Sequence, residues 1–432
     1  MKLSPPFVLL ALLAASPLAP AEKFVVHEWG VQVIGRAQGG PVLTAPDELL
    51  GGLPGFVGRN VTPLRFEFHG WDKPVIHFYG REAMEVSVKV GTPVGVPLAF
   101  FPPPKIGMGE QWGLSAKRMM AGMLHFSSGM EWHGRLRSAA PDNLPTAPAE
   151  HWWNTARTIP SSYFETTTGS ERFVFYEATA VQKPVIASKI GEGAIELRNS
   201  HDTAVGPVVI VVNDGTGVRG VEKKTIGPGK DLVIAKADLR KWTEEETLAA
   251  CRRQWRALGM TEAESAGIVE VWKSDLVARL GVLVIAPMPE VLYNKMFPLE
   301  IVPKPDEIVR AGLVFDTLTG QDARRHWLPA LNAELRKRGD MFESEKFAER
   351  TAAQAAFRAA GDLGLEVLAA LSKSEEPEVR RTAKRLAKEI NSGELRIDLV
   401  RPTKENSTSL VEQLTPPSKS REPLQPLKRE GR

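Results

Sequence analysis

The sequence predicts a multidomain α+β protein, in which an antiparallel β-sandwich-rich domain with a helical pair precedes a short α-helical HEAT-like module. Between residues 24 and 236, short runs of alternating apolar and polar residues are separated by Gly and Pro, which is typical of antiparallel sandwiches. Over residues 243–280, and again over 347–390, apolar residues recur at helical spacing. The change from strand periodicity to helix periodicity predicts the order of the domains along the chain.

The start of the chain predicts export. Residues 1–21 contain Lys2, an apolar run at 7–15 and an A-x-A pattern at 19–21, which together are typical of a cleaved secretory signal peptide. No later stretch has the roughly 20 uninterrupted apolar residues that a membrane helix needs. We therefore expect an exported protein, periplasmic or extracellular, with no integral membrane span.

Composition narrows the class of protein further. Cys251 is the only cysteine, so an intramolecular disulfide is excluded, and we expect this residue to be buried on a helix. A formal net charge of +3 on 432 residues is close to balance and does not indicate nucleic-acid binding.

Residues 25–34 follow the signal peptide and alternate with period two, which indicates a β-strand. Because successive side chains of a strand point to opposite faces, His27 should share a face with Trp29, and Glu28 should point the other way. The two cannot act on one atom unless the strand bulges, for which Gly30 is suited. His27 is then either a metal ligand or general base, or a half-buried imidazole bonded to a backbone carbonyl.

The Val-His-Glu-Trp-Gly run at residues 26–30 resembles that of a family of exported bacterial proteins with no assigned activity. The family carries threonine and phenylalanine where Val31 and Gln32 stand, and tyrosine in place of His77. The resemblance extends over most of residues 22–320 and implies a shared fold but no mechanism. Further matching stretches are KPVIHFY at 73–79, ERFVFY at 171–176 and PLEIVPKP at 298–305.

The strands of the β-rich domain are expected from alternation between turn residues. Residues 107–160 lack clear periodicity, and we expect them to form a long loop region packed on the sandwich. The expected strands lie at residues 64–68, 75–79, 84–90, 172–176, 185–188, 194–199, 208–213 and 231–235.

Three glycines after the strand at 208–213 spell G-x-G-x-x-G: Gly215, Gly217 and Gly220. A nucleotide-binding turn would require a helix to begin there. Residues 221–226 leave room for a strand rather than a helix, so this stretch predicts a hairpin.

The helical pair at 243–280 is predicted from two capping boxes, Thr243 with Glu246 and Thr261 with Glu264. We interpret it as an excursion from one large domain, after which the chain returns to the sheet. The returning strands are expected at residues 282–286, 299–302 and 308–315.

The C-terminal third contains an internal repeat. Two matching sets of residues lie about thirty positions apart, Glu349, Arg350 and Ala353 in the first, and Glu378, Arg380 and Ala383 in the second. Stacked helix pairs of this kind resemble HEAT repeats, and the resemblance implies a protein partner bound by the helices.

The domain boundaries follow from these changes in pattern. We expect a signal peptide at 1–21, the β-rich domain at 22–320, the HEAT-like module at 321–395 and a disordered tail at 396–432. One and a half repeats cannot form a free solenoid, so the module should dock on the β-rich domain, with 322–338 as its preceding helix.

The candidate metal ligands are His27, Glu67, His69 and His77. Residues 70–73 suggest a turn, and a hairpin there would bring His69 and His77 together, with Glu67 completing a two-histidine, one-carboxylate site for zinc or iron. Alternation instead places Glu67 and His69 on a solvated face, in which case no cofactor is expected.

Other chemistry has less support. The sequence has no G-x-S-x-G elbow, and Cys251 falls in the middle of a helix, so no nucleophile stands out. Three histidines in the irregular segment are spaced unlike a helical zinc motif: His125, His133 and His151. Four tryptophans either form a sugar-stacking platform or cover one side of the sandwich: Trp112, Trp132, Trp152 and Trp153.

A defined architecture without a convergent catalytic set favours an exported, non-catalytic binding or scaffold protein. The alternatives are a metal-dependent hydrolase that uses the four candidate ligands, and a carbohydrate-binding module that uses the tryptophans.

Overall fold

The computed structural model describes residues 23–37, 40–43, 53–59, 69–80, 82–93, 97–108, 128–149, 151–180, 184–223, 225–318 and 322–392. Within these ranges the protein is a mixed α+β structure with large antiparallel sheets and several helices, which confirms the predicted class at that level. The expected signal peptide, the strand at 64–68 and the expected tail lie outside the described residues.

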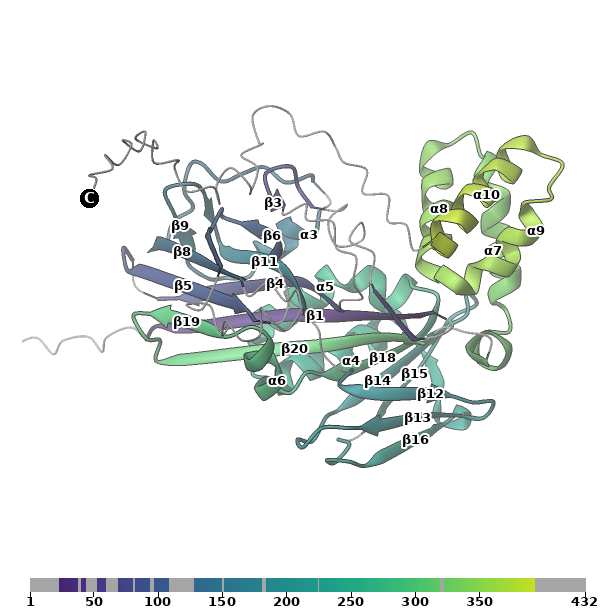
Figure 1. Ribbon diagram of the computed structural model, residues 1–432, viewed down its shortest axis with the longest axis horizontal. Coiled ribbons are helices and arrows are strands. Elements are labelled where there is room, and N and C mark those ends of the chain that lie inside the picture. Colours follow the sequence, from purple (N-terminus) through teal and green to yellow (C-terminus); the bar gives the residue numbers. More distant parts are fainter. Residues whose placement is uncertain are drawn as a thin grey trace, which may run out of the picture.

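An 11-stranded sheet crosses the molecule (Figure 1). Its order is β17-β15-β14-β18-β20-β1-β4-β11-β6-β3, with β2 paired to β1. All of its pairs are antiparallel except β1 with β20, which run parallel at the centre. Its strands are β1 Val25–Ala37, β2 Gly40–Leu43, β3 Gly58–Arg59, β4 His69–Tyr79, β6 Pro97–Phe101, β11 Phe173–Ala180, β14 Val208–Asn213, β15 Val218–Lys223, β17 Arg240–Trp242, β18 Gly281–Pro287 and β20 Glu307–Leu318.

Two smaller sheets pack on one face of the large sheet. Ile76 and Phe78 of β4 share a continuous buried core with Trp132 from the first small sheet and Leu197 from the second. The first contains β5 Glu85–Thr92, β7 Lys105–Met108, β8 Ser128–Arg137, β9 Tyr163–Glu165, β10 Ser170–Glu171 and β19 Leu299–Val302. The second contains β12 Ile186–Ile190, β13 Ala194–Asn199 and β16 Asp231–Ala235, followed by the short turn η2 Lys236–Asp238.

The strand β8 corrects the expectation of a long loop at 107–160. Met130 and Trp132 point into the core, and residues 128–135 of β8 pair with β5. The alternation is weak because Gly134 interrupts the apolar face formed by Met130, Trp132 and Leu136.

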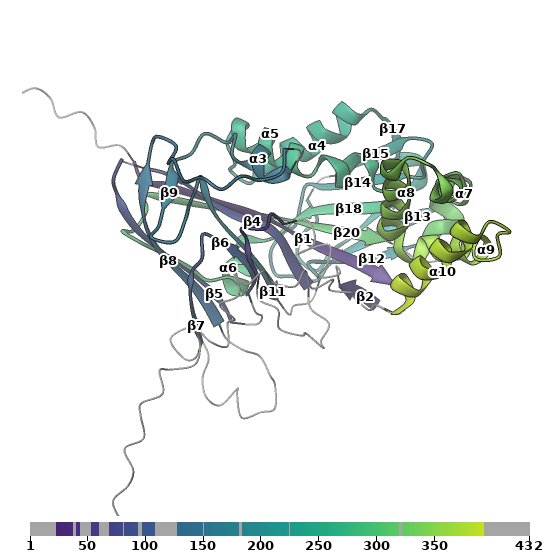
Figure 2. The same ribbon diagram turned by 90° about the horizontal axis from the view of Figure 1, so that it is seen from above.

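Helices cover the other face of the large sheet (Figure 2). They are α3 Trp152–Ala156, α4 Glu244–Ala257, α5 Glu262–Val271 and the π-helical turn η3 Ser274–Ala278. Both predicted capping boxes are present, at Thr243 and Thr261. As predicted, Cys251 is buried on α4, and burial raises the pKa of its thiol to about 12.

The glycine run forms the predicted hairpin. β14 and β15 pair antiparallel, Gly215 and Gly217 lie in the turn between them, and Gly220 lies within β15. Gly215 has a φ of 92°, which favours glycine. After β18 the chain forms the short helix α6 Glu290–Met296, then β19 and β20, at the positions expected for returning strands.

The C-terminal helices dock on the sheets, as expected. Trp327 is buried, its indole Nε1–H donates to Gly191 O at 2.7 Å, and its carbonyl accepts from Arg219 Nη2 at 2.9 Å. Residues 322–338 are not one helix, because a break follows Trp327. The elements are η4 Ala323–Trp327, α7 Leu331–Asp340, η5 Met341–Glu343, α8 Phe347–Ala360, η6 Gly361–Gly364, α9 Leu365–Leu371 and α10 Pro377–Ser392.

Among the described residues, no helix combines the length and the apolar character needed to cross a bilayer.

Candidate functional site

The N-terminal part of β1 carries the two ionisable residues that the sequence singled out. His27 lies on the helical face, where its Nδ1 is 2.8 Å and 2.9 Å from the two oxygens of Glu264. Glu28 lies on the opposite face, where Arg310 Nε donates to its Oε2 at 2.5 Å. The predicted separation of His27 and Glu28 is therefore confirmed, and the irregular pairing opposite Gly30 leaves it intact.

Glu264 accepts the hydrogen bonds that hold together the cluster of polar side chains on the helical face of the large sheet. It lies in the first turn of α5 and completes the capping box of Thr261, whose N–H donates to Oε2 at 2.7 Å. It also accepts from Tyr79 Oη at 2.6 Å. Burial alone would raise the pKa of this carboxyl, but the hydrogen bonds from His27, Tyr79 and Thr261 lower it to about 2. Burial and the Glu264 charge raise the pKa of Tyr79 far above its usual value.

His77 is the cross-strand neighbour of His27 on β4. Its Nδ1 is 2.9 Å from Ser161 Oγ, which itself donates to Arg172 O at 3.2 Å. The hydroxyl proton is thus directed to the carbonyl, so His77 Nδ1 donates and Nε2 keeps its lone pair. Nε2 is buried without a hydrogen-bond partner. Burial is the main reason that the pKa of this imidazole falls to about 4.

The expected hairpin at 70–73 is wrong, because residues 69–79 form the single strand β4. Lys73 and Pro74 form an irregularity in the pairing with β1, and Lys73 has a φ of 51°. His69 and His77 are eight residues apart on this strand, roughly 26 Å at the usual rise. That is too far for both to bind one ion.

Of the four candidate ligands, the structure brings together only His27 and His77. Glu67 lies outside the described residues, as does the side chain of His69. Within the described part of the chain, no group of three or more His, Cys, Asp or Glu residues is arranged to hold a metal ion.

The Glu28 cluster is a buried ion pair on the sheet–sheet face. Tyr176 Oη donates to Glu28 Oε1, and Arg310 Nη1 donates to Asn294 Oδ1 at 2.6 Å. The Arg310 guanidinium lies 4.3 Å from the centre of the Tyr293 ring. Burial lowers the pKa of Arg310, but the Glu28 carboxylate and the two tyrosines more than offset this and raise it above its usual value.

The other candidate residues do not converge. His133 is exposed on β8, His151 accepts from Trp153 N as the cap of α3, and His125 lies outside the described residues. Trp132 is buried in the core between the sheets, whereas Trp153 is buried in the core under the helices. These two tryptophans therefore belong to opposite faces of the large sheet and form no common stacking platform. Trp152 is partly buried, and Trp112 lies outside the described residues.

The helical module repeats one set of contacts. Arg350 Nη1 donates to the carbonyls of Ser344 and Glu345 at 2.6 Å and 3.0 Å. Arg380 Nη1 donates to those of Ser374 and Glu375 at 2.5 Å and 3.0 Å. Each arginine thereby ties the loop before its helix to the first turn of that helix. The internal repeat seen in the sequence thus has a structural counterpart.

A pocket of about 350 Å³ lies where the loop before α8 meets the start of α10. It is lined by Phe342, Glu343, Ser344, Glu345, Arg350 and Glu378. Phe347, which is 74% exposed, has its ring 5.7 Å from the guanidinium of the lining residue Arg350. The pocket therefore combines three glutamates with one arginine, and an exposed aromatic ring lies beside that arginine.

No protein-family model matches the chain, and none of the curated protein sequences matches it. Among solved structures, the chain is similar to the yeast delta-COP-I mu-homology domain complexed with a Dsl1 WxWxV peptide, with 7% sequence identity and a TM-score of 0.27 over 69% of this chain and 98% of that one. The yeast delta-COP-I mu-homology domain alone gives 9% identity and a TM-score of 0.25 over 69% and 97%. At TM-scores this low, the likeness carries no weight for fold or function.

Sequence reasoning missed the partners of both β1 residues. Glu264 was recognised only as a capping residue, although a cap that is also buried is free to accept a further bond. The sequence contains a signal for the partner of Glu28, because Arg310 is the one charged residue within the apolar run 308–315. A charge at such a position requires a buried partner.

Proposed function

We propose that this is an exported, non-catalytic binding or scaffold protein that holds a protein partner through its C-terminal helical module. The proposal rests on one observation: the exposed Phe347 ring lies against Arg350, which lines the pocket at the start of α8 and α10. Large exposed apolar side chains next to a concave site are typical of protein-binding surfaces. The HEAT-like character of the module, which the repeated arginine contacts support, fits the same role.

The charge of the pocket indicates the chemistry of the partner. Glu343, Glu345 and Glu378 line it, while the Arg350 guanidinium is engaged by two backbone carbonyls. The carboxylates favour a partner that places a lysine or arginine in the pocket and an apolar residue against Phe347.

The arrangement at β1 supports the non-catalytic part of the proposal. The Glu28 and Glu264 carboxylates each accept bonds from groups inside the protein, and both residues are fully buried. A general base needs an accessible lone pair within reach of a substrate proton. These clusters therefore serve better as supports for the central strands than as reacting groups.

Photo-crosslinking in cells that express the protein tests whether the helical module binds a protein partner. We expect Phe347→Ser to abolish capture of the partner, because an aromatic anchor contributes about 2 kcal/mol or more, roughly thirtyfold in Kd. Val233→Ser is the matched control, since it removes a side chain of comparable exposure, 59%, from β16. Identical capture by wild type, Phe347→Ser and Val233→Ser would refute a role for the module.

The rival, a metal-dependent hydrolase, is favoured by the pairing of His27 with His77 across two strands. Metal analysis of the purified protein distinguishes the binding protein from the hydrolase. A hydrolase would contain stoichiometric zinc or iron that His77→Ala removes and His69→Ala retains, because His69 lies at the far end of β4. The binding proposal expects no stoichiometric metal in any of these proteins.

A further inference from the structure

The N-terminal half of β20 has a neighbour on one side only. β18 ends at Pro287 opposite Leu313, and one last bond joins Met288 N to Gly312 O at 2.8 Å. Residues 307–311 pair with β1, and no strand among the described residues pairs with their other side. The sheet therefore has an internal edge near its centre, where β18 turns away into α6.

The direction in which each backbone N–H and C=O group on this edge points follows from the alternation of residues along a strand. In a strand, successive residues direct their N–H and C=O groups to opposite sides, so residues two apart share a side. Gly312 faces β18, because it accepts from Met288. The pairing of β20 shows no register shift, so Arg310 and Ile308 face the same side. Their N–H and C=O groups point to where a further strand would lie.

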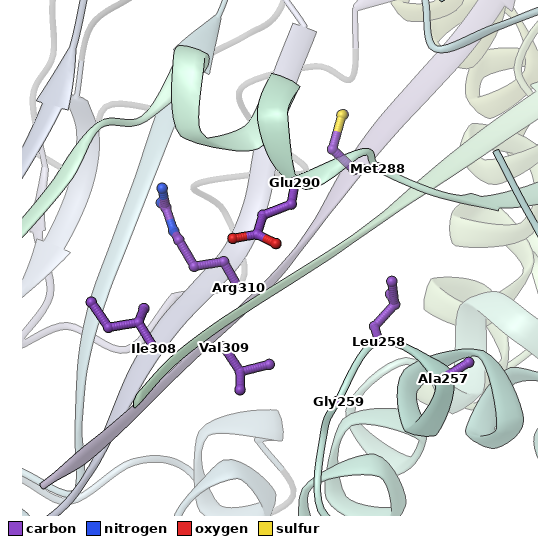
Figure 3. Close-up of a pocket in the computed structure, with 8 residues that line it drawn as sticks. All are labelled: Ala257, Leu258, Gly259, Met288, Glu290, Ile308, Val309 and Arg310. Carbon is purple, nitrogen blue, oxygen red and sulfur yellow. The ribbon is translucent and has the colours of Figure 1, made fainter. Parts of the chain in front are cut away.

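A groove of about 410 Å³ follows this edge (Figure 3). Leu258 and Gly259, from the loop after α4, lie on one side of β20, and Met288 and Glu290 lie on the other side. Val309 points toward the loop, and Arg310 points toward Glu290 and α6. A strand added here would thus place its alternate side chains against two different walls.

The two walls differ in chemistry. The wall formed with Val309 consists of Ala257, Leu258 and Gly259, and it is apolar. The other wall carries Glu290, which is exposed. The guanidinium of Arg310 does not offset that charge, because Glu28 already neutralises it on the buried side, where the Arg310 side chain is only 3% exposed.

We propose that this groove binds an extended peptide segment of a partner protein, in which apolar and basic residues alternate, as an added strand on β20. Unpaired strand edges take up extended peptides through main-chain hydrogen bonds, and pockets for alternate side chains select the sequence. Ile308, 39% exposed at the open end, adds apolar area to the same edge. This site is separate from the helical module and does not depend on it.

Fluorescence anisotropy of a labelled octapeptide of alternating valine and lysine, titrated with the full chain, tests the proposal. Ile308→Pro deletes the N–H that faces the groove, and proline is tolerated on a strand edge when its missing N–H points away from the ladder. We expect it to weaken binding about tenfold, the value of one main-chain hydrogen bond, while Ile308→Val binds as wild type does.

The charged wall provides a second variant that leaves the backbone intact. Glu290→Lys should weaken binding of the same peptide about tenfold or more, whereas Glu300→Lys on β19, an exposed site outside the groove, should leave it unchanged. N-methylation of the peptide on alternate residues should abolish binding without any change to the protein.

Three outcomes would overturn the proposal. One is equal affinity for the valine–lysine peptide and for its valine–glutamate counterpart. Another is unchanged affinity in both Ile308→Pro and Glu290→Lys. The third is sedimentation showing that wild type forms a dimer that Ile308→Pro abolishes, with no peptide bound, because a second copy would then occupy the edge. Phe347→Ser should bind the peptide normally, so failure of the helical-module proposal is distinguishable from failure of this one.

Discussion

His27 and Glu28 are neighbours in the sequence, yet each lies in a separate buried cluster. Period two in the sequence was sufficient to place them on opposite faces, because alternation is a local property of a strand. Their partners could not be predicted in the same way. Glu264 is 237 residues from His27, and Arg310 is 282 residues from Glu28, so only the completed fold brings them together.

The Glu28–Arg310 pair predicts a large loss of stability when one partner is removed. Glu28→Gln leaves the Arg310 guanidinium buried beside a neutral amide, and we expect a decrease of about 3–5 kcal/mol in the free energy of unfolding. Glu85→Gln is the matched control: it breaks the exposed pair with Arg135 and should cost less than about 1 kcal/mol. Urea unfolding measures both, and similar losses would show that the buried pair has no special role.

His77 predicts a specific dependence of stability on pH. The unfolded chain binds a proton as the pH falls below 6.5, whereas the folded protein resists protonation of His77 down to about pH 4. The free energy of unfolding should therefore fall by about 2 kcal/mol between pH 7.5 and pH 5 from this residue alone. His77→Phe should lose that part of the pH dependence, and His133→Phe, at an exposed site, should retain it.

Chemical unfolding at both pH values measures this effect. The window lies above the range in which Glu264 titrates, because its pKa is lowered from 4.5 to about 2 and its contribution is lost only as the pH falls below 4.5. Equal pH dependence in wild type and His77→Phe would contradict the assignment of a buried, neutral imidazole.

Helix positions were predicted more accurately than strand pairings. Thr243 and Thr261 begin α4 and α5 as expected, because a capping box lies within four residues of sequence. β4 was mistaken for a hairpin, since Gly70 and the Lys73-Pro74 step are common turn signals. In the structure Gly70 pairs in register with Val33, and Lys73 and Pro74 place one extra residue opposite Gly30. Only the neighbouring strand β1 determines which outcome occurs.

The repeated arginines predict matched effects in the two helical units. Arg350→Ala and Arg380→Ala each remove two bonds from a guanidinium to loop carbonyls, and we expect each to cost about 2 kcal/mol. Arg381→Ala removes only an exposed contact with Glu378 and should cost less than about 0.5 kcal/mol. Hydrogen exchange of α8 and α10 measures the losses locally, and unequal effects of Arg350 and Arg380 would argue against equivalent units.

Across the whole molecule, a central sheet separates two cores. The core between the sheets continues into the helical module, where Leu331, Phe357 and Leu386 belong to the same buried cluster as Phe78. The sequence predicted that the module docks but not where, because Trp327, which anchors it, lies in a short segment without clear periodicity.

This continuity predicts that the described parts of the chain unfold together. Trp327→Ala should destabilise the protein by about 3–5 kcal/mol, since it removes a fully buried indole and its bond to Gly191 O. In wild type, calorimetry should show a single transition for the sheets and the module. Two separate transitions would show that the module folds independently of the sheets.

The parallel pairing of β1 with β20 also bears on how the protein is made. β1, the first strand among the described residues, receives its neighbour β20 only after residue 318 has emerged, so neither core can close before most of the chain is present. Until then, β1 and β4 expose apolar faces and unpaired backbone to the surrounding medium. A chain truncated before Glu307 should therefore accumulate as aggregates, and a folding helper that covers β1 should raise the yield of the full-length protein.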